Sequence, residues 1–527
     1  MQSPKPPAPA DLSTTEMELK FLVDAPTFQA LQHARLLSGT APLALQAIRS
    51  IYFDTVDADL WQHHQTILRL RTQGETHILT VKSAATDATN PFARSEIEVA
   101  CPSADLDLTC LAPPVLAEIQ QIIGDKPLLP RFETDIQRKV ARVVAQGSDI
   151  EVAFDSGHIV HGGAREPIQE IELELKSGDA VDLFGLGLAL TEIAPVRLHM
   201  QSKAARGRQL SAGTPARAVR AHTALAAADA VDDVIALTLA TALRQFVDNW
   251  PAFATDDAPE AVHQMRVAMR RLRAALALFH RSFPCVEFAV MRADARRIAK
   301  AMNEARNWDV FGEMSGPAGP GLFQAERGFA AVRQAAETHR RAGHQQVADL
   351  LAGVEATRFV LSGLAFIARR GWRNSIPSAD LPRLSAPATG FAAASLERLH
   401  RRVRKRGKAI ADMPASERHA LRLSLKALRY PSDFFADLFP ATPATRLYLR
   451  AVSRLQDVLG TFNDMVTITD QVRRLHVHDD APAARAVGIM LGWYGRAAVA
   501  DDAAVLKAWQ AFRRAKPFWT DALNAAA

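Results

Sequence analysis

Charged and apolar positions alternate along residues 16–21, the stretch with the clearest pattern near the start of the chain. Consecutive side chains in a β-strand point to opposite faces, so this alternation predicts a strand with one charged and one apolar face. The charged positions are Glu16, Glu18 and Lys20, and the apolar positions are Met17, Leu19 and Phe21. For this stretch alone, a solvent-exposed charged face is the simplest interpretation.

The alternating pattern recurs, between turn signals, as far as residue 176. The predicted strands are residues 16–23, 48–55, 66–72, 77–83, 94–99, 132–144, 150–155 and 169–176, and residues 27–37 form a predicted helix. Short strands separated by turns favour an antiparallel barrel or sandwich. Two arrangements fit. The charged faces could all look outward, or they could look inward and line a polar tunnel covered by helices.

Electrostatics favours the tunnel, provided that it holds a polyanionic ligand. Like charges about 4 Å apart repel by roughly 4 kcal/mol at an effective dielectric near 20, so strands with two glutamates on one face need cations among them. Carboxylates that converge on one point suit a hard divalent ion such as Mg²⁺ or Mn²⁺, and arginine forks match phosphate oxygens. The pattern therefore predicts a metal-complexed polyanion as the ligand.

The charged motifs follow one another in a definite order: Glu16-x-Glu18-x-Lys20, Tyr52-Phe53-Asp54-Thr55, Arg69-x-Arg71, Lys82, Arg94-x-Glu96-x-Glu98, Arg138, Asp155, Glu170-x-Glu172-x-Glu174 and Ser202-Lys203. This ordered set, which spans residues 14–210, resembles the CYTH or triphosphate tunnel metalloenzyme superfamily. The resemblance implies an eight-stranded antiparallel tunnel and an attack on a triphosphate that depends on Mg²⁺ or Mn²⁺. The superfamily includes inorganic and thiamine triphosphatases, class IV adenylate cyclases and fungal RNA triphosphatases.

The resemblance also implies a role for each charged residue. Metal ligands would be Glu16, Glu18, Asp155, Glu170 and Glu172, and phosphate oxygens would be held by Arg69, Arg71, Lys82, Arg94, Arg138 and Lys203. Lys20 is the candidate catalytic residue, which would orient or activate the attacking water. Its alternative role is to neutralise Glu16 and Glu18. Glu96, Glu98 and Glu174 are expected in the tunnel without an assigned role.

After a short linker at residues 211–217, long helical periodicity replaces the strand pattern through residues 218–515. An internal repeat is visible there, because a histidine is followed by basic residues at offsets 3, 7 and 10 in two places. The first set is His263, Arg266, Arg270 and Arg273, and the second is His419, Arg422, Lys426 and Arg429. At about 100° per residue each set lies on one helix face, with apolar residues at offsets 2, 6 and 9 facing elsewhere.

The repeat extends further, because Asn307 follows the first histidine by the same spacing at which Asn463 follows the second, and Asp309 and Asp464 come shortly after these asparagines. We infer two related halves, residues 225–370 and 385–515, each a bundle of about four helices. This region resembles the CHAD domain, and the resemblance implies polyphosphate binding in a basic groove but does not imply catalysis. The alternatives are an ordinary solvated face for the basic residues and packing roles for the histidines. Asn307 stands where the family more often has aspartate.

Composition agrees with an anionic partner, because 63 basic residues outnumber 57 acidic ones. Three cysteines make neither a disulfide framework nor a zinc site. Residues 1–13 are proline-rich, which predicts a disordered lead, and no apolar run reaches the length of a membrane span. We therefore expect a cytoplasmic protein with no membrane partner, and association with polyphosphate granules is a further option.

The sequence thus predicts an α+β protein: an N-terminal tunnel domain at residues 14–210, then an all-α domain at residues 218–515. The expected function is that of an inorganic triphosphatase, which hydrolyses tripolyphosphate to diphosphate and phosphate and binds longer polyphosphate through its helices. The alternatives are an adenylate cyclase or a thiamine or nucleoside triphosphatase on the same tunnel, and a non-catalytic polyphosphate-granule binding protein. Nucleic acid is a less favoured anion for the basic helices.

Overall fold

The structure is a computed structural model that describes residues 14–37, 44–63, 65–84, 92–315, 327–477, 479–499 and 502–526. The predicted disordered lead, residues 1–13, lies outside this set. The chain divides into two compact units. The first unit comprises the chain as far as Arg217 with Trp250–Thr255 and Leu351–Arg369, and the second comprises the remainder.

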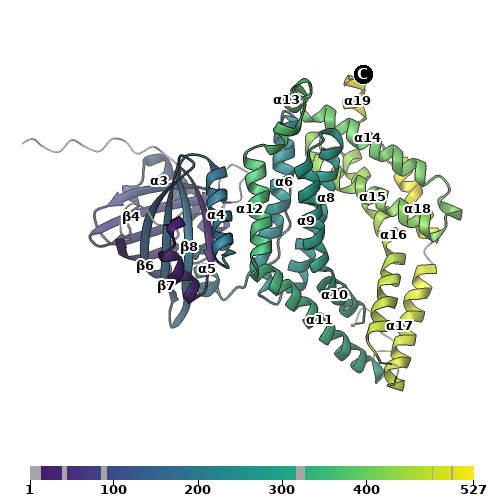
Figure 1. Ribbon diagram of the computed structural model, residues 1–527, viewed down its shortest axis with the longest axis horizontal. Coiled ribbons are helices and arrows are strands. Elements are labelled where there is room, and N and C mark those ends of the chain that lie inside the picture. Colours follow the sequence, from purple (N-terminus) through teal and green to yellow (C-terminus); the bar gives the residue numbers. More distant parts are fainter. Residues whose placement is uncertain are drawn as a thin grey trace, which may run out of the picture. The chain divides into compact units, whose positions relative to one another are not determined.

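Eight antiparallel strands form a closed ring in the first unit (Figure 1). They are β1 (Thr14–Leu22), β2 (Ala44–Asp54), β3 (Ile67–Gln73), β4 (Thr76–Ala84), β5 (Ala93–Cys101), β6 (Leu129–Ala145), β7 (Ser148–His161) and β8 (Ala164–Ser177). Their order is β5-β4-β3-β2-β6-β7-β8-β1, and pairing of β1 with β5 closes the ring. Each predicted strand is confirmed, and the observed strands β6, β7 and β8 are longer than predicted.

Helices cover the apolar outer faces of these strands. They are α1 (Ala25–Gln32), α2 (Asp59–Gln62), α3 (Pro113–Ile123) and α4 (Ala180–Ile193). A further helix, α5 (Lys203–Ala212), instead packs its Ala204 on the inward-facing Tyr52 and Ile136 and borders the interior of the ring. Leu19 and Phe21 of β1 are fully buried, and both lie within 3.2 Å of where a Cβ on Gly187 of α4 would stand. A side chain at position 187 would therefore require these neighbours to shift, so the glycine allows α4 to pack closely on β1. On another side, α3 packs against Leu70 and Leu79 of β3 and β4.

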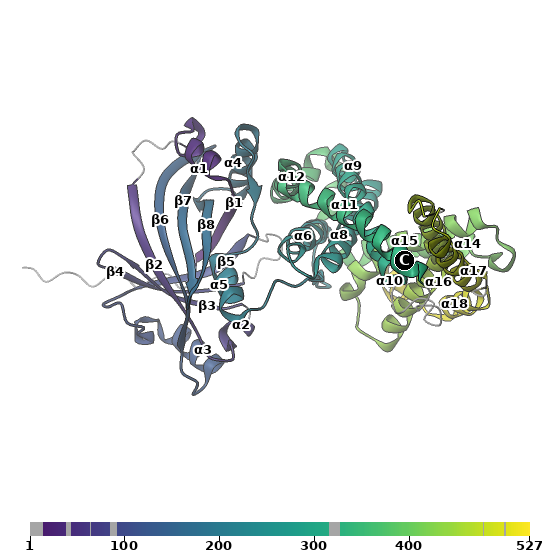
Figure 2. The same cartoon turned by 90° about the horizontal axis from the view of Figure 1, so that it is seen from below.

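Because the apolar positions face outward beneath helices, the alternate charged positions must face inward. This is the tunnel arrangement, and the outward-facing alternative is wrong. The views in Figures 1 and 2 show the long strands curving around one another as a ring requires. A short strand, β9 (Arg197–Leu198), pairs with β1 beside the closure.

One helix that lies much later in the sequence groups with the first unit. Helix α12 (Val354–Ala368) packs on α4. Thr357 Oγ1 accepts a hydrogen bond of 3.0 Å from the backbone N–H of Leu198, and Arg358 Nε donates one of 2.9 Å to Thr191 Oγ1. The compact first unit therefore includes a segment from the predicted helical domain.

The second unit is built of helices, as predicted. Its principal helices are α6 (Val231–Val247), α8 (Ala258–Ser282), α9 (Val286–Ala301), α10 (Asn303–Ser315), α11 (Gly328–Ala352), α14 (Ala388–Arg406), α15 (Ala415–Phe435), α16 (Pro443–Arg474), α17 (Ala481–Val499) and α18 (Asp502–Arg514). Helix α8 packs against α6, α9 and α15. The predicted apolar positions of the repeat are fully buried: Met265, Met269, Leu272, Leu421, Leu425 and Leu428.

Among the described residues, no single helix has both the length and the apolar character needed to cross a membrane. The pair Gly328–Ala352 and Val354–Ala368, which is bent by 54°, meets that test only when its two helices are taken together, on length and composition alone.

Candidate functional site

A cavity of about 340 Å³ runs inside the strand ring, and charged side chains of both signs line it. Most of the predicted tunnel residues are in this lining: Glu16, Glu18, Lys20, Arg69, Arg71, Lys82, Arg94, Glu96, Glu98, Arg138, Glu172, Glu174 and Lys203. The two other predicted residues, Asp155 and Glu170, are fully buried beside Glu172. Alternation along the strands thus places the predicted set in and around one cavity.

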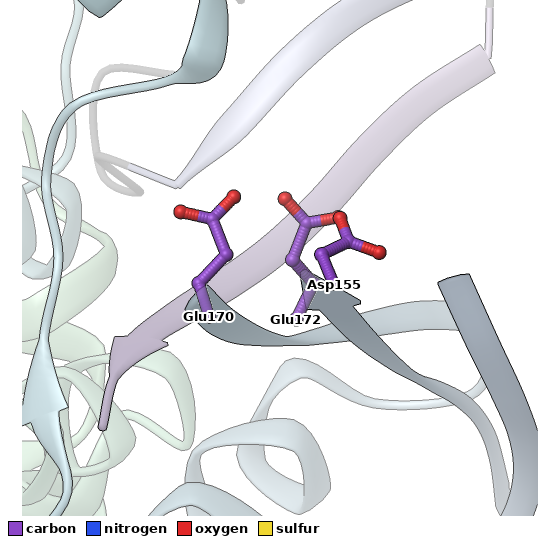
Figure 3. Close-up of side chains that lie close together, drawn as sticks. All are labelled: Asp155, Glu170 and Glu172. Carbon is purple, nitrogen blue, oxygen red and sulfur yellow. The ribbon is translucent and has the colours of Figure 1, made fainter. Parts of the chain in front are cut away.

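Three carboxylates come together at one wall of the tunnel (Figure 3). Asp155 of β7 is the register partner of Glu170 on β8, and Glu172 lies two residues further along β8 on the same face. One oxygen from each of the three lies within 4.8 Å of the others. Among the described residues, only this group brings three potential metal ligands so close together.

Lys203, the first residue of α5, reaches into this acidic group. Its Nζ lies 2.7 Å from Asp155 Oδ2 and 2.7 Å from Glu172 Oε1, and it also contacts Glu170 Oε1. Burial alone would lower the pKa of Lys203, but Asp155, Glu170 and Glu172 raise it well above its usual value. Lys203 is therefore an ammonium ion surrounded by three carboxylates.

Two further cations hold the same group. Arg138 donates from Nε to Asp155 Oδ1 at 2.7 Å and from Nη2 to Glu172 Oε2 at 2.5 Å. Lys20 lies 2.6 Å from Glu172 Oε1 and also contacts Glu18. Although burial would raise the pKa of Glu172, Lys20, Lys203 and Arg138 hold it well below its usual range. Glu172 is thus ionised at neutral pH.

Glu18 has the opposite electrostatic environment. Burial, followed by repulsion from Glu172, raises the pKa of Glu18 to about 8 despite its contact with Lys20. A further cation near Glu18 would favour its ionised form. Lys20 stays protonated, because Glu172 and Glu18 raise its pKa although burial opposes this. An ammonium can orient a water molecule but cannot deprotonate it.

Glu16 belongs to a second group of charges, although it is only two residues from Glu18. Lys82 lies 2.6 Å from Glu16 and 2.9 Å from Glu96. Arg69 and Arg71 lie 3.3 and 3.1 Å from Glu98. The separation follows from strand pairing, because β1 pairs with β5 at Glu16 and with β8 at Glu18. Of the five predicted metal ligands, the structure brings together Asp155, Glu170 and Glu172. Glu18 adjoins Glu172 through Lys20, and Glu16 lies apart from them with Lys82.

Sequence reasoning missed Arg206, and it gave no site role to Glu151 and Lys176, which also line the cavity. Arg206 donates to Glu166 and to the carbonyl of Pro167, both at 2.6 Å, and to Glu170 Oε2 at 3.4 Å. It therefore ties the beginning of β8 to α5 and orients Glu170. A signal was present, because Arg206 follows Lys203 by three residues and so lies on the same helix face.

In the second unit, the predicted basic residues of the first repeat crowd together on α8. Burial and the neighbours Arg270 and Arg306 lower the pKa of Arg266 to about 10. Burial and Arg306 lower the pKa of His263 to about 4, so this histidine is neutral at pH 7. Burial and the neighbouring Arg292 and Arg296 likewise lower the pKa of Arg273. Positive charge is therefore in excess on this face.

The second repeat differs in its acidic neighbours. Arg429 of α15 lies 3.8 Å from Asp457 and 3.9 Å from Asp433. His419 is exposed, and Arg422 and Lys426 are half-buried on the same helix. In the first repeat, Asp309 is buried and lies 2.8 Å from His344 Nε2. The matching Asn463 and Asp464 lie outside the residues whose side chains are described.

Comparisons with known proteins match both regions. The CYTH domain model matches residues 14–207, and the CHAD domain model matches residues 237–473. An inorganic triphosphatase of Haemophilus influenzae is 31% identical over 185 residues, which are 34% of this chain and 47% of that protein. The chain thus spans about half the length of that relative.

Two further similarities cover more of the chain. An uncharacterised protein of Mycobacterium tuberculosis is 25% identical over 520 residues, which are 93% of each chain. The crystal structure of the CHAD domain from the plant Ricinus communis is 28% identical, covers 59% of this chain and 96% of that chain, and has a TM-score of 0.45. Taken with the two domain matches, the strand ring and the helical repeat establish that this chain belongs to the proteins in which a CYTH domain is followed by a CHAD domain.

Proposed function

We propose that the strand tunnel is the active site of a metal-dependent inorganic triphosphatase that converts tripolyphosphate to diphosphate and phosphate. The observation that carries the proposal is the cavity of about 340 Å³ in which a three-carboxylate group adjoins the cations of the opposite wall. The similarity to an inorganic triphosphatase over the tunnel region supports it.

The residues present fit a hard divalent cation. Asp155, Glu170 and Glu172 offer three carboxylate oxygens within 4.8 Å of one another, and oxygen ligands of this kind suit Mg²⁺ or Mn²⁺. Glu18 lies beside this group through Lys20, and a nearby divalent ion would favour the ionised form of Glu18 that burial disfavours. A bound divalent ion would neutralise phosphate charge and polarise a phosphoryl oxygen.

The protein's own cations would bind and orient the substrate. Arg69, Arg71, Lys82 and Arg94 line the cavity on the side away from the acidic group and would hold phosphate oxygens, with Arg138 and Lys203 at the acidic group itself. Arginine forks give paired, directional hydrogen bonds to phosphate. Lys20 would orient the attacking water, because its protonated ammonium cannot serve as a base. Phosphoryl transfer needs chiefly such positioning and charge neutralisation.

The available space favours an inorganic substrate over a nucleotide or thiamine ester. A pocket lined by Tyr52, Trp61 and Phe132 lies beside the tunnel and could contact an aromatic ring. Its volume is about 60 Å³ against about 340 Å³ for the charged cavity. Most of the space in the ring is therefore bordered by charges that match phosphate.

We further propose that the basic residues of α8 and α15 bind longer polyphosphate. The excess positive charge around Arg266 supports this, because a polyanion would supply the missing countercharge. In this proposal the helices bring the enzyme to polyphosphate in the cytoplasm, and they take no part in catalysis.

The test is an assay of the full chain with Mg²⁺ and, separately, Mn²⁺. Phosphate release from tripolyphosphate should exceed release from ATP and thiamine triphosphate, and no cyclic AMP should form. If ATP or thiamine triphosphate were turned over faster than tripolyphosphate, that compound would be the preferred substrate in place of tripolyphosphate. No turnover of any of them, with polyphosphate binding intact, would favour the non-catalytic binding protein.

A further inference from the structure

The contacts of Lys203 divide the oxygens of the acidic group into an inner and an outer set. Lys203 Nζ contacts the inner oxygens, which are Asp155 Oδ2, Glu170 Oε1 and Glu172 Oε1. The contact with Glu172 Oε1 is a hydrogen bond of 2.7 Å, and the contacts with Asp155 and Glu170 are ion pairs. The side chain of Lys203 is only 10% exposed, so little water competes for these contacts.

Arginines hold the outer oxygens. Arg138 Nε binds Asp155 Oδ1 at 2.7 Å, and Arg138 Nη2 binds Glu172 Oε2 at 2.5 Å. Arg206 Nη1 lies 3.4 Å from Glu170 Oε2. Two inner contacts are shared, because Arg138 Nη2 also reaches Asp155 Oδ2 and Lys20 also reaches Glu172 Oε1. The arginines therefore orient the three carboxylates, and Lys203 alone contacts all three inner oxygens.

We propose that Lys203 is a displaceable counter-ion, which competes with a divalent cation for the three inner oxygens and turns toward bound phosphate when that cation enters. A divalent ion and an ammonium cannot share these oxygens, because two cations so close together would repel strongly. The side chain of Lys203 can move into the tunnel cavity, because it already borders that cavity and is long and flexible.

This exchange couples the two halves of the proposed site, and in this respect it rests on the proposed function. With Lys203 on the carboxylates, the phosphate-binding wall lacks one positive charge. With Lys203 released, that charge becomes available to the substrate. Metal entry would therefore raise affinity for tripolyphosphate, and tripolyphosphate would raise affinity for the metal by the same factor.

The first test measures Mn²⁺ binding to the full chain without substrate, by the loss of the free-ion electron paramagnetic resonance signal. Lys203→Met keeps the length and apolar stem of the side chain but removes the competing charge. We expect this variant to bind Mn²⁺ at least about tenfold more tightly, because metal entry no longer breaks a buried ion pair. Equal or weaker binding than in the unaltered chain would overturn the proposal.

Arg206→Met is the matched control. It also removes a buried cation beside Glu170, but one that contacts an outer oxygen. Its Mn²⁺ affinity should stay the same or fall, because Glu170 loses its orientation. If both variants bound Mn²⁺ more tightly by the same factor, the cause would be the loss of one positive charge at any position near the carboxylates. The proposed exchange of Lys203 for the metal ion would then be rejected. Neither measurement needs turnover, so failure of this inference is distinguishable from failure of the triphosphatase proposal.

A second test uses the unaltered chain and so does not depend on how the variants fold. Acetic anhydride labels free amines, and mass spectrometry can follow Lys203 and Lys20 in one sample. Mn²⁺ should increase labelling of Lys203 about threefold or more, because displacement exposes its amine to the reagent. Labelling of Lys203 that stays constant or falls on addition of Mn²⁺ would contradict the exchange.

Discussion

In the strand tunnel, basic side chains lie against carboxylates, whereas on helix α8 they lie against one another. Lys203 contacts three carboxylates, and Arg138 contacts two. Arg266 has Arg270 and Arg306 as its charged neighbours, and these with burial lower its pKa to about 10. Both surfaces are proposed to bind phosphate chains, but they begin from opposite electrostatic states.

The difference predicts two modes of anion binding. In the tunnel, a phosphate must take the place of a carboxylate that already contacts Arg69, Lys82 or Lys203, so binding there is an exchange of ion pairs. The net gain in binding free energy is small for each exchanged ion pair, and it depends strongly on the geometry of the contact. On α8, a polyanion supplies a countercharge that the protein lacks. Binding there should tolerate many chain lengths and respond strongly to salt.

The largest expected effect is on turnover in the tunnel, where phosphate must replace carboxylates as the partner of the cations. Glu172→Gln removes the carboxylate that contacts Lys20, Arg138 and Lys203. Turnover of tripolyphosphate should fall about a thousandfold or more, because three cations lose their common partner and the acidic group loses a ligand. Phosphate release under saturating substrate measures this.

Glu174→Gln is the control for that variant. Glu174 lies on the same face of β8 but pairs at 2.6 Å with Lys176, which is 32% exposed. Its replacement should reduce turnover less than about tenfold. If Glu172→Gln kept more than a tenth of the activity, the acidic group would not be the reaction centre.

A smaller effect is expected on α8. Arg266→Met should weaken binding of long-chain polyphosphate about tenfold, since one phosphate contact is lost, while turnover in the tunnel stays unchanged. The variant should unfold at the same temperature or a higher one, because the charge that it removes is repelled by Arg270 and Arg306.

Arg297→Met on α9 is the comparison here, because Arg297 is 55% exposed and already pairs with Asp294. It should leave polyphosphate affinity nearly unchanged. A marked loss of stability in Arg266→Met would mean that this arginine is held by favourable contacts, and the contrast between the two regions would fail.

The smallest effect concerns pH. Burial and Arg306 lower the pKa of His263 to about 4, and a bound polyanion would raise it by favouring the protonated form. Between those two pKa values the complex holds one proton more than the free protein, so affinity rises as pH falls. From pH 7 to pH 5 the gain should be about threefold to tenfold.

His263→Gln provides the reference for this titration, because protonation of polyphosphate itself affects both proteins equally. Calorimetry at each pH gives the affinity of the unaltered protein divided by that of the variant. This ratio should rise as the pH falls, because only the unaltered protein carries the histidine. A ratio that stays constant from pH 7 to pH 5 would show that His263 does not face the anion.

Local pattern was sufficient to predict the strands and the charges that share a face, while it left open whether that face looks inward. Alternation along residues 16–21 and 169–176 determines which side chains share a face once the strands pair. The helical repeat could also be predicted from local pattern, because only a helix brings residues with the spacing of Met265, Met269 and Leu272 to one side. These features depend on neighbours within a few residues.

What could not be predicted depends on contacts between distant segments. Glu16 and Glu18 fall into different charge groups because β1 changes partner between them, and nothing local marks that change. Arg206 reaches Glu170 from a helix, where strand alternation gives no guide. The packing of α12 on α4 joins segments more than a hundred residues apart, and each is simply apolar in sequence.

Closure of the ring also sets the order of events during synthesis. Lys20 meets Glu172 across 152 positions of the chain, so β1 leaves the ribosome long before its partner exists. Contacts between such distant segments form slowly, and unpaired strands expose apolar surface while they wait. Leu19 and Phe21 on β1 must therefore remain shielded, by transient contacts or a chaperone, until β8 has been made. The ring can close only after β8 has been made, and α12, which also groups with the first unit, is made later still.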